Sequence, residues 1–205
     1  MKTGIKSLFA ALFVLAGAAW PVNAAPVLVI LETEKGNIEL AVDADRAPIS
    51  SASFLAHVDA GLYNGSGGFY RTVYPENDNG NPKISVIQGG VLPGAESLPP
   101  VAHETTEQTG ILHKDGVISL ARAEVGTGGG AAFFICIGDQ PSLDMGGGRA
   151  VSGDGQGFAA FGHVVSGMDV VNAIHRSPPS SAGEDAYLAG QILNPPVRIV
   201  KAYRK

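Results

Sequence analysis

The feature that most limits how this 205-residue chain can fold is a repeated alternation of short apolar, β-branched runs with glycine or proline. Such runs predict strands, and the glycine- and proline-rich segments between them predict turns and loops. Eight runs qualify: 27–33, 37–42, 68–73, 84–88, 117–121, 132–137, 158–164 and 197–203. Only Glu34-Lys35-Gly36 separates the first two runs, which therefore predict a hairpin.

Two segments show a helical pattern. In the first, Pro48 suits the first turn and Gly61 suits the C-terminal end. Its apolar residues at helical spacing are Ile49, Ala52, Leu55, Ala56 and Val58. In the second, Ser166 and Asp169 have the spacing of a capping box. The apolar face behind that box consists of Val170, Val171 and Ile174.

Eight short strands and two distant helices favour a closed antiparallel β-barrel over a sheet of alternating strands and helices. A closed barrel has no exposed edge strand, and the helices would cover its two open ends. Closure would place the first and last strands side by side. Four segments are expected to be long surface loops: 74–83, 91–115, 144–157 and 177–196.

Residues 1–24 have the pattern of a secretory signal peptide. Lys2 and Lys6 provide positive charge, residues 8–20 are apolar, and Val22-Asn23-Ala24 precedes a cleavage site. We therefore expect cleavage after Ala24, export to the periplasm, and one domain over residues 25–205. Because no other apolar run approaches the roughly 18 residues that span a membrane, the mature chain is expected to have no membrane association.

The charge balance argues against polyanionic partners. The chain has 14 basic and 19 acidic residues. The first 24 residues contain two lysines and no acid, so the mature chain has 12 basic against 19 acidic residues, a net charge of −7. Nucleic acids and anionic membranes select basic surfaces. The single cysteine, Cys136, lies in the apolar run 133–137 and predicts a buried thiol.

Motifs for cofactors and nucleophiles are weak or absent. Residues 126–131 loosely match a dinucleotide fingerprint, but that motif needs a following helix, whereas residues 132–137 predict a strand. The five histidines show no i,i+4 pair typical of a metal site. The chain also has no Gly-x-Ser-x-Gly motif. No cofactor and no metal are therefore expected.

Two features remain: Arg71 behind two aromatic residues, and Gln88 before paired glycines. With "GVISLARAEVGTGGGAAFFICIGDQPSLD" (116–144) and "GFAAFGHVVSGMDVV" (157–171), the segments "FYR" and "VIQGG" resemble the cyclophilin family of peptidyl-prolyl cis-trans isomerases. The resemblance extends from Val27 to Tyr203 and is strongest to an exported bacterial branch. The family fold is an eight-stranded antiparallel barrel capped by two helices, which agrees with the strands and helices counted above.

The resemblance implies a set of site residues. Arg71 matches the principal catalytic group, and Gln88 matches the glutamine that holds this arginine and the substrate backbone. Ala121 and Arg122 match positions that bind the peptide main chain. The resemblance implies a proline pocket formed by Val86, Phe134, Leu143 and Phe158.

These residue types suit a reaction in which no covalent bond breaks. Rotation about an X–Pro amide faces a barrier of about 18–20 kcal/mol. As the amide twists, the proline nitrogen becomes a hydrogen-bond acceptor, so a guanidinium directed at it binds most strongly in the transition state. The resemblance thus implies an isomerase that acts on proline-containing segments of exported polypeptides during folding. The alternative is a proline-peptide binding module or chaperone with little turnover.

Several positions depart from the family pattern. Ser85 stands where the family typically has a pocket phenylalanine, Arg122 where asparagine is common, and Phe158 where histidine or tyrosine is common. Ser142 stands where many eukaryotic members have a tryptophan associated with tight binding of cyclosporin, so cyclosporin should bind weakly. The expected partners are proline-containing polypeptides, and we expect a monomer.

Overall fold

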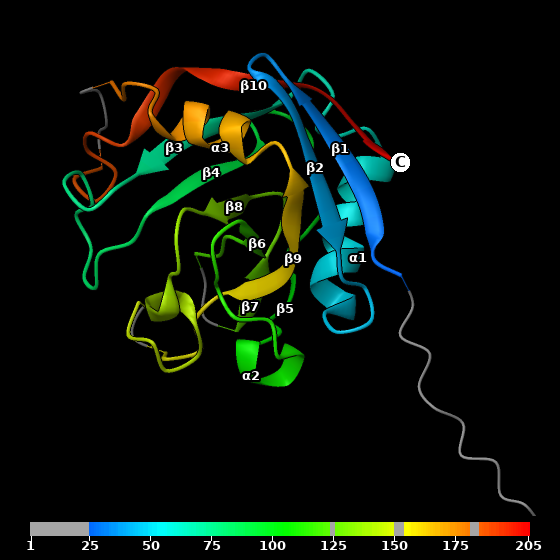
Figure 1. The fold of residues 1–205 in the computed structure, drawn as a ribbon, viewed down its shortest axis with the longest axis horizontal. Helices are drawn as coiled ribbons and strands as arrows, with labels where there is room; N and C mark the ends of the chain where they lie inside the picture. The colour runs from blue at the N-terminus through cyan, green and yellow to red at the C-terminus, as the bar shows by residue number, and fades with distance from the viewer. Residues whose placement is uncertain (1–24, 124–125, 150–153, 181–184) are drawn as a thin grey trace, which may run out of the picture.

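The structure, a computed structural model, describes residues 25–123, 126–149, 154–180 and 185–205. The predicted signal peptide lies outside these residues. Eight strands close into a barrel in the order β1-β10-β3-β4-β8-β6-β9-β2 (Figure 1). These strands are β1 (Val27–Thr33), β2 (Gly36–Val42), β3 (Gly67–Val73), β4 (Val86–Val91), β6 (Val117–Leu120), β8 (Phe133–Cys136), β9 (Ala159–Ser166) and β10 (Ile192–Arg204). Two further strands, β5 (Val101–Ala102) and β7 (Thr127–Gly129), pair with each other.

The predicted closed antiparallel barrel is confirmed. The first and last barrel strands are neighbours, with Val29 of β1 opposite Arg204 of β10. The predicted hairpin is also present, because Thr33 pairs with Gly36 across the loop Glu34-Lys35.

Two strand boundaries differ from the prediction for physical reasons. β4 begins at Val86 and continues through the paired glycines to Val91, because those glycines are part of the ladder with β3. A Cβ on Gly89 would lie 2.9 Å from the Phe69 ring, so a larger residue would push the two strands apart. β10 begins at Ile192, inside the predicted loop 177–196, and a register shift between Ile192 and Val197 accommodates its two prolines.

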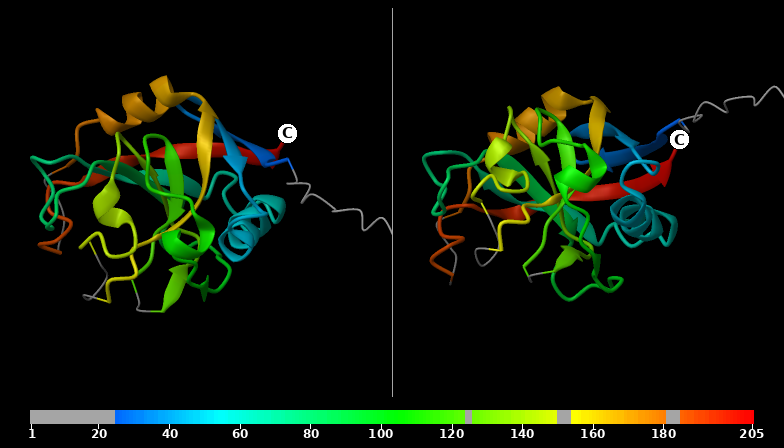
Figure 2. Two further views of the ribbon diagram at one scale, coloured as in Figure 1. Left: turned by 60° about the horizontal axis from the view of Figure 1, so that its bottom comes forward. Right: turned by 90° about the horizontal axis from the view of Figure 1, so that it is seen from below.

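Both predicted helices exist, and two shorter helices were not predicted. The predicted ones are α1 (Pro48–Asp59) and α3 (Met168–His175). The others are α2 (Thr106–Thr109), within the predicted loop 91–115, and the 3₁₀ helix η1 (Pro141–Leu143). Figure 2 shows α1 and α3 on different sides of the barrel: α1 contacts β9 and β10, and α3 contacts β2, β3 and β4.

The predicted apolar face of α1 is largely wrong. Ile49, Ala52 and Ala56 are exposed, whereas Phe54 and small serines are buried. The ring of Phe54 lies 5.2–5.8 Å from the rings of Tyr63, Phe133 and Phe161, so a large aromatic contact decides which side of the helix faces the core.

The predicted capping box at Ser166 is also wrong. Ser166 is the last residue of β9 and pairs with Glu39, and Gly167 in the left-handed region precedes α3 without a side-chain cap. A capping box is present at α2 instead, between Thr105 and Gln108. The N-terminus of α1 is bonded by the distant carboxylate of Glu104, which accepts hydrogen bonds from the backbone N–H groups of Ile49 and Ser50.

The apolar interior forms two clusters. The larger fills the barrel and includes Phe54 and Val58 of α1 with Val171 and Ile174 of α3. The smaller lies outside the larger core and contains Val73, Ile84, Val86, Phe134, Cys136 and Leu143. Cys136 is fully buried, as predicted, and burial raises the pKa of its thiol well above the ordinary value.

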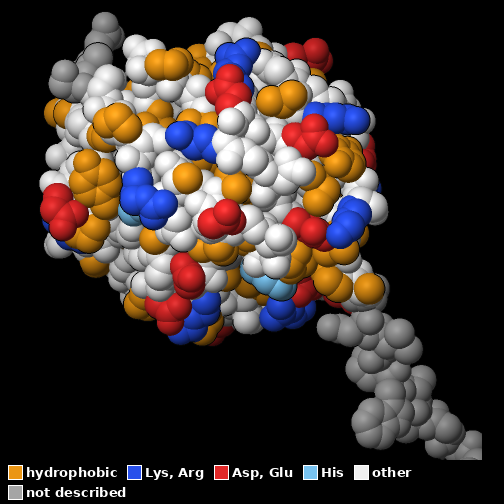
Figure 3. Space-filling model, turned by 45° about the horizontal axis from the view of Figure 1, so that its top comes forward, with side chains coloured by type: hydrophobic (Ala, Val, Ile, Leu, Met, Phe, Trp, Pro, Cys, Tyr) orange, Lys and Arg blue, Asp and Glu red, His pale blue; other side chains and the backbone are white. Residues whose placement is uncertain are grey.

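In the described part of the chain, no helix is both long and apolar enough to cross a membrane. On the face shown in Figure 3, basic and acidic side chains of the described residues are interspersed rather than gathered by sign.

Candidate functional site

A β-bulge sets the direction of Arg71. Phe69 of β3 is opposite Gly89 of β4, and Arg71 is opposite Gln88, so Tyr70 is an extra residue in β3. Adjacent residues of a strand face opposite sides. The partners Gly89 and Gln88 are adjacent in β4 and so face opposite sides. Phe69 and Arg71 therefore also face opposite sides, although they are two residues apart in β3. The bulge leaves Phe69 fully buried in the barrel core and directs Arg71 to a surface cavity.

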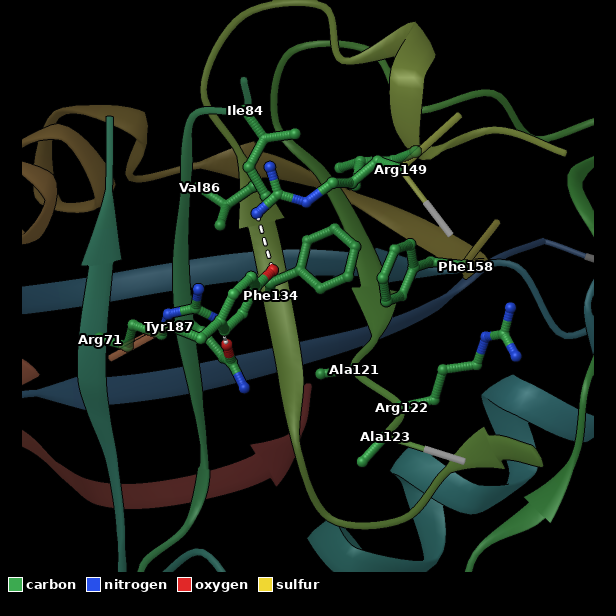
Figure 4. Close-up of a pocket in the computed structure, with 12 residues that line it drawn as sticks. Arg71, Ile84, Val86, Ala121, Arg122, Ala123, Phe134, Arg149, Phe158 and Tyr187 are labelled. Atoms are coloured by element: carbon green, nitrogen blue, oxygen red, sulfur yellow. Dashed lines mark hydrogen bonds between the residues drawn. The ribbon is translucent and has the colours of Figure 1, made fainter. Parts of the chain in front are cut away.

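The cavity brings together every site residue that the sequence predicted. It has a volume of about 360 Å³. The predicted residues that line it are Arg71, Val86, Gln88, Ala121, Arg122, Phe134, Leu143 and Phe158. Four lining residues were not predicted: Ile84, Ala123, Arg149 and Tyr187 (Figure 4).

One part of the cavity is apolar and rigidly packed. Phe134 of β8 contacts Phe158 edge to face, with ring centroids 5.5 Å apart. Phe134 also stacks on His113, with ring centroids 5.8 Å apart. Val86 and Leu143 are almost completely buried beside it. A small apolar ring could enter against Phe134 and Phe158 without displacing water from polar groups there.

Arg71 faces this apolar part and is held by two amide side chains. Its Nη1 donates to Oε1 of Gln88 at 2.8 Å. Its Nε and Nη2 both donate to Oε1 of Gln191, at 2.8 and 2.6 Å. Burial lowers the pKa of Arg71 from its ordinary value, but a guanidinium stays protonated in proteins. The site therefore contains a fixed, permanently charged donor.

The other two arginines of the cavity are neutralised. Arg122 donates to both carboxylate oxygens of Asp154, at 2.6 and 2.9 Å, and to the backbone oxygen of Gly157. Because the Arg122 side chain is buried in these contacts, its predicted contact with a peptide main chain would have to come from its own backbone. Arg149 is likewise paired with Asp78, and its Nη2 donates to the hydroxyl of Tyr187 at 2.8 Å.

Ser85, at the position where the family typically has a pocket phenylalanine, is directed away from the cavity. Its hydroxyl lies 3.1 Å from Nε2 of His175 in α3, and Ser85 does not line the cavity. Both neighbours of Ser85 line the cavity: Ile84, in the segment before β4, and Val86, the first residue of β4. Alternation of side chains along extended backbone explains the difference. The additional aromatic wall comes from Tyr187, whose ring lies 5.3 Å from Cζ of Arg71.

Behind the cavity, three residues have the order of a hydrolase triad. His113 contacts Oδ1 of Asp144 through Nδ1 at 2.7 Å and Oγ of Ser119 through Nε2 at 3.0 Å. Ser119 is fully buried, however, and it lies outside the residues that line the cavity. Its hydroxyl has no route to a substrate, so these three residues support Phe134 rather than act as a nucleophile.

Three residues that the sequence missed come from two of the predicted loops. Arg149, Tyr187 and Gln191 lie outside the predicted strands and helices and follow no periodic pattern. The only signal was the length of the loops 144–157 and 177–196, which is typical of functional segments. Among the described residues, no group of three His, Cys, Asp or Glu side chains is placed to hold a metal ion.

Comparisons with known proteins identify the family. Residues 28–203 match the model of the cyclophilin-type peptidyl-prolyl cis-trans isomerases. Peptidyl-prolyl cis-trans isomerase A of Dickeya dadantii is 34% identical over 158 residues, which cover 76% of this chain and 74% of that protein. An isomerase of Acinetobacter baylyi is 29% identical and covers 88% of this chain and 87% of its own length.

The fold comparison agrees. The crystal structure of a cyclophilin-type isomerase from Cryptosporidium parvum superposes with a TM-score of 0.62 at 16% identity, covering 87% of this chain and 98% of that one. The match to the family model over 28–203, together with the eight-stranded barrel, shows that this chain belongs to the cyclophilin-type peptidyl-prolyl cis-trans isomerases.

Proposed function

We propose that this isomerase accelerates X–Pro rotation in exported, incompletely folded polypeptides, and that Arg71 stabilises the twisted amide beside an apolar proline pocket. The observation that carries the mechanism is the position of Arg71: a charged guanidinium, held by two neutral amides, faces the pocket that contains Phe134 and Phe158.

The apolar part of the cavity would hold the pyrrolidine ring. Phe134, Phe158 and Leu143 supply flat and branched apolar surface, and their packing leaves no freedom to collapse onto an empty pocket. The solved relative from Cryptosporidium parvum was crystallised in the presence of the dipeptide Ala-Pro, which supports a proline-containing ligand here.

Arg71 would act on the proline nitrogen. In the planar amide this nitrogen shares its electron pair with the carbonyl and accepts hydrogen bonds poorly. In the twisted amide the pair is available, so a guanidinium N–H gains a hydrogen bond that neither planar form offers. A fixed donor needs little reorganisation when the amide twists. The reaction makes and breaks no covalent bond, so it requires no cofactor.

The main chain before the proline would bind along Ala121 and Arg122. Both residues line the cavity next to Ala123, at the end of β6. Because the Arg122 guanidinium is already bonded to Asp154, this contact would use backbone groups, which fits substrates of varied sequence.

Substitution of Arg71 tests the mechanism. Arg71→Ala should lower kcat/KM by roughly 30- to 1,000-fold, which corresponds to about 2–4 kcal/mol of transition-state stabilisation. Arg71→Lys should rescue poorly, because lysine keeps the charge but lacks the planar fork that the amides hold. The measurement is exchange spectroscopy on a short X–Pro peptide, with peptide affinity measured separately by titration. If folded Arg71→Ala bound peptide and turned over like the wild type, the mechanism would be wrong. If the wild type bound peptide without turnover, it would be a binding module.

The cellular part of the proposal rests on the sequence of residues 1–24. Their charged start, apolar segment and Val22-Asn23-Ala24 support export and cleavage after Ala24. The clients would then be polypeptides that reach the periplasm unfolded.

A further inference from the structure

We propose that Gln191 is a positioning residue for the isomerase reaction: it fixes Arg71 from the side opposite Gln88 through a neutral acceptor. The inference rests on the proposed role of Arg71. Gln191 lies 120 residues from Arg71 in sequence, does not line the cavity, and belongs to no motif that the sequence analysis identified.

Gln191 makes the more extensive of the two contacts with Arg71. Its single oxygen accepts hydrogen bonds from Nε at 2.8 Å and from Nη2 at 2.6 Å, whereas Gln88 accepts only from Nη1. A guanidinium has five N–H groups. Three of the five are used by the two amides, which leaves two for Tyr187 or a substrate. A guanidinium bonded on both edges cannot rotate about its own side chain without breaking at least one contact.

Gln191 is itself held in place. It is fully buried, and its Nε2 donates to the backbone oxygen of Asn77 at 2.7 Å. Its own backbone oxygen accepts from the N–H of Thr72 in β3 at 2.9 Å. Asn77 in turn donates through Nδ2 to the backbone oxygens of Thr72 and Gly190. The polar loop 74–83 therefore orients the Gln191 amide, with its oxygen directed at Arg71.

Arg71 differs from the other two arginines of the cavity in the charge of the side chain that holds it. Arg122 and Arg149 line the same cavity, and each is paired with an aspartate. Among the described residues, Arg71 has no carboxylate within salt-bridge distance, and its side-chain partners are the uncharged Gln88, Gln191 and Tyr187. A carboxylate at position 191 would hold the same edge but would compete with the developing acceptor on the substrate. A neutral acceptor orients the charge without cancelling it.

The competing explanation is that the buried amide of Gln191 only stabilises the fold. Three variants separate this explanation from a role in positioning Arg71. Gln191→Leu removes the acceptor, and Gln191→Asn keeps an amide but withdraws it by about one C–C bond, ~1.5 Å. Both should lower kcat by roughly 10- to 100-fold, since misplacing a catalytic group by about 1 Å has effects of this size. Peptide affinity should stay within about threefold of the wild type, because the contact matters only in the transition state. Gln191→Glu should hold Arg71 in place and still lower kcat.

The Nε–H resonance of Arg71, assigned with Arg71→Lys, reports the contact directly. It should be shifted and protected from exchange in the wild type and in Gln191→Glu, and should move to the position of a solvated arginine in Gln191→Leu and Gln191→Asn. Gln140→Leu is the matched control, because Gln140 is a buried amide that bonds the backbone of Ser85 and Ile137 instead. That variant should lose comparable stability while the Arg71 signal stays in place.

A double-mutant cycle completes the test. If Gln191 acts through Arg71, Gln191→Leu should have no further effect on kcat in an Arg71→Ala background. An undiminished effect in that background, or an unchanged Nε–H signal in Gln191→Leu, would overturn the inference. Wild-type turnover of Gln191→Glu would overturn the need for a neutral partner. Wild-type turnover of Arg71→Ala would instead refute the proposed mechanism, and the Nε–H signal would still decide whether Gln191 holds Arg71.

Discussion

Asp78 and Arg149 form a buried two-point ion pair across 71 residues of sequence, with Nη1–Oδ2 at 2.7 Å and Nη2–Oδ1 at 2.8 Å. The pair fixes one wall of the cavity, because Arg149 also donates to the hydroxyl of Tyr187. Burial opposes the charge of Asp78, but hydrogen bonds from Arg149 and from the backbone of Gly80 and Ile84 outweigh it. The pKa of Asp78 is therefore lowered from its ordinary value.

This pair predicts a pH-dependent contribution to stability. A carboxylate whose pKa is lowered by folding stabilises the native state above its unfolded pKa of about 3.9, and the contribution is lost as pH falls through the lower, folded pKa. Asp78→Asn should lower the free energy of unfolding by about 3–5 kcal/mol at pH 7, because it leaves Arg149 buried and unpaired. Urea unfolding at pH 7, 5 and 3 should show the two proteins converging below pH 4. Parallel curves would contradict a charged Asp78.

The position of Ser85 predicts which substitutions change substrate binding. Ile84 lines the cavity, so Ile84→Ala should raise KM by roughly fivefold, which corresponds to about 1 kcal/mol of lost apolar contact. Ser85→Phe should not lower KM, because the new ring would meet His175 instead of entering the cavity. It should lower the melting temperature instead. Steady-state kinetics and thermal unfolding of the two variants check this, and a lower KM for Ser85→Phe would refute the assignment.

Cyclosporin should bind weakly, and Ser142 offers a direct test. Ser142 lies in η1 next to Leu143, which lines the cavity, and is not fully buried. Ser142→Trp should tighten cyclosporin binding by roughly 5- to 150-fold, since an added aromatic contact supplies about 1–3 kcal/mol. Ser142→Ala, which adds no contact, should leave the affinity unchanged. Inhibition titrations measure all three proteins, and nanomolar inhibition of the wild type would contradict the prediction.

The buried Ser119–His113–Asp144 arrangement should have no hydrolytic activity. Because Ser119 is fully buried, a serine-directed phosphonate should not label the folded protein. Ser119→Ala should lower the free energy of unfolding by about 1–3 kcal/mol, because it leaves His113 without a partner at Nε2. Mass spectrometry after phosphonate treatment is the measurement, and a stoichiometric adduct on Ser119 would show that the site opens.

Processing should produce a mature chain that begins at Ala25. Intact-mass measurement of the exported protein checks the cleavage site, with a variant carrying a bulky residue at position 24 as a control that should be processed poorly. Retention of residues 1–24 in the exported protein would refute the signal peptide and the periplasmic location.

Motifs that resemble those of the family were sufficient to predict much of the site. Arg71 and Gln88 were identified from their motifs, and the ladder places them opposite each other on adjacent strands. Val86, Phe134 and Phe158 belong to or flank strands, where a period of two residues determines which side chains share a face. Such features depend on a few neighbouring residues, and the sequence therefore carries them.

Local pattern failed where packing between distant segments decides the outcome. In α1, spacing alone favoured Ile49 and Ala52, whereas the contact of Phe54 with Phe133 and Phe161 turned the helix to another face. The family pattern has a pocket phenylalanine at the position of Ser85, but the alternation of side chains here directs Ser85 to His175.

Strand periodicity and turn residues act over a few positions, so the amino-acid sequence was sufficient to predict the barrel, and its resemblance to the cyclophilin family implied the principal residues of the cavity. The direction of Arg71 and the contacts that hold it depend on the tertiary structure. The bulge at Tyr70 turns Arg71 away from the core, and Gln191 reaches it from 120 residues away. Contacts of that kind depend on the path of whole loops through space, and no propensity of the residues themselves specifies that path.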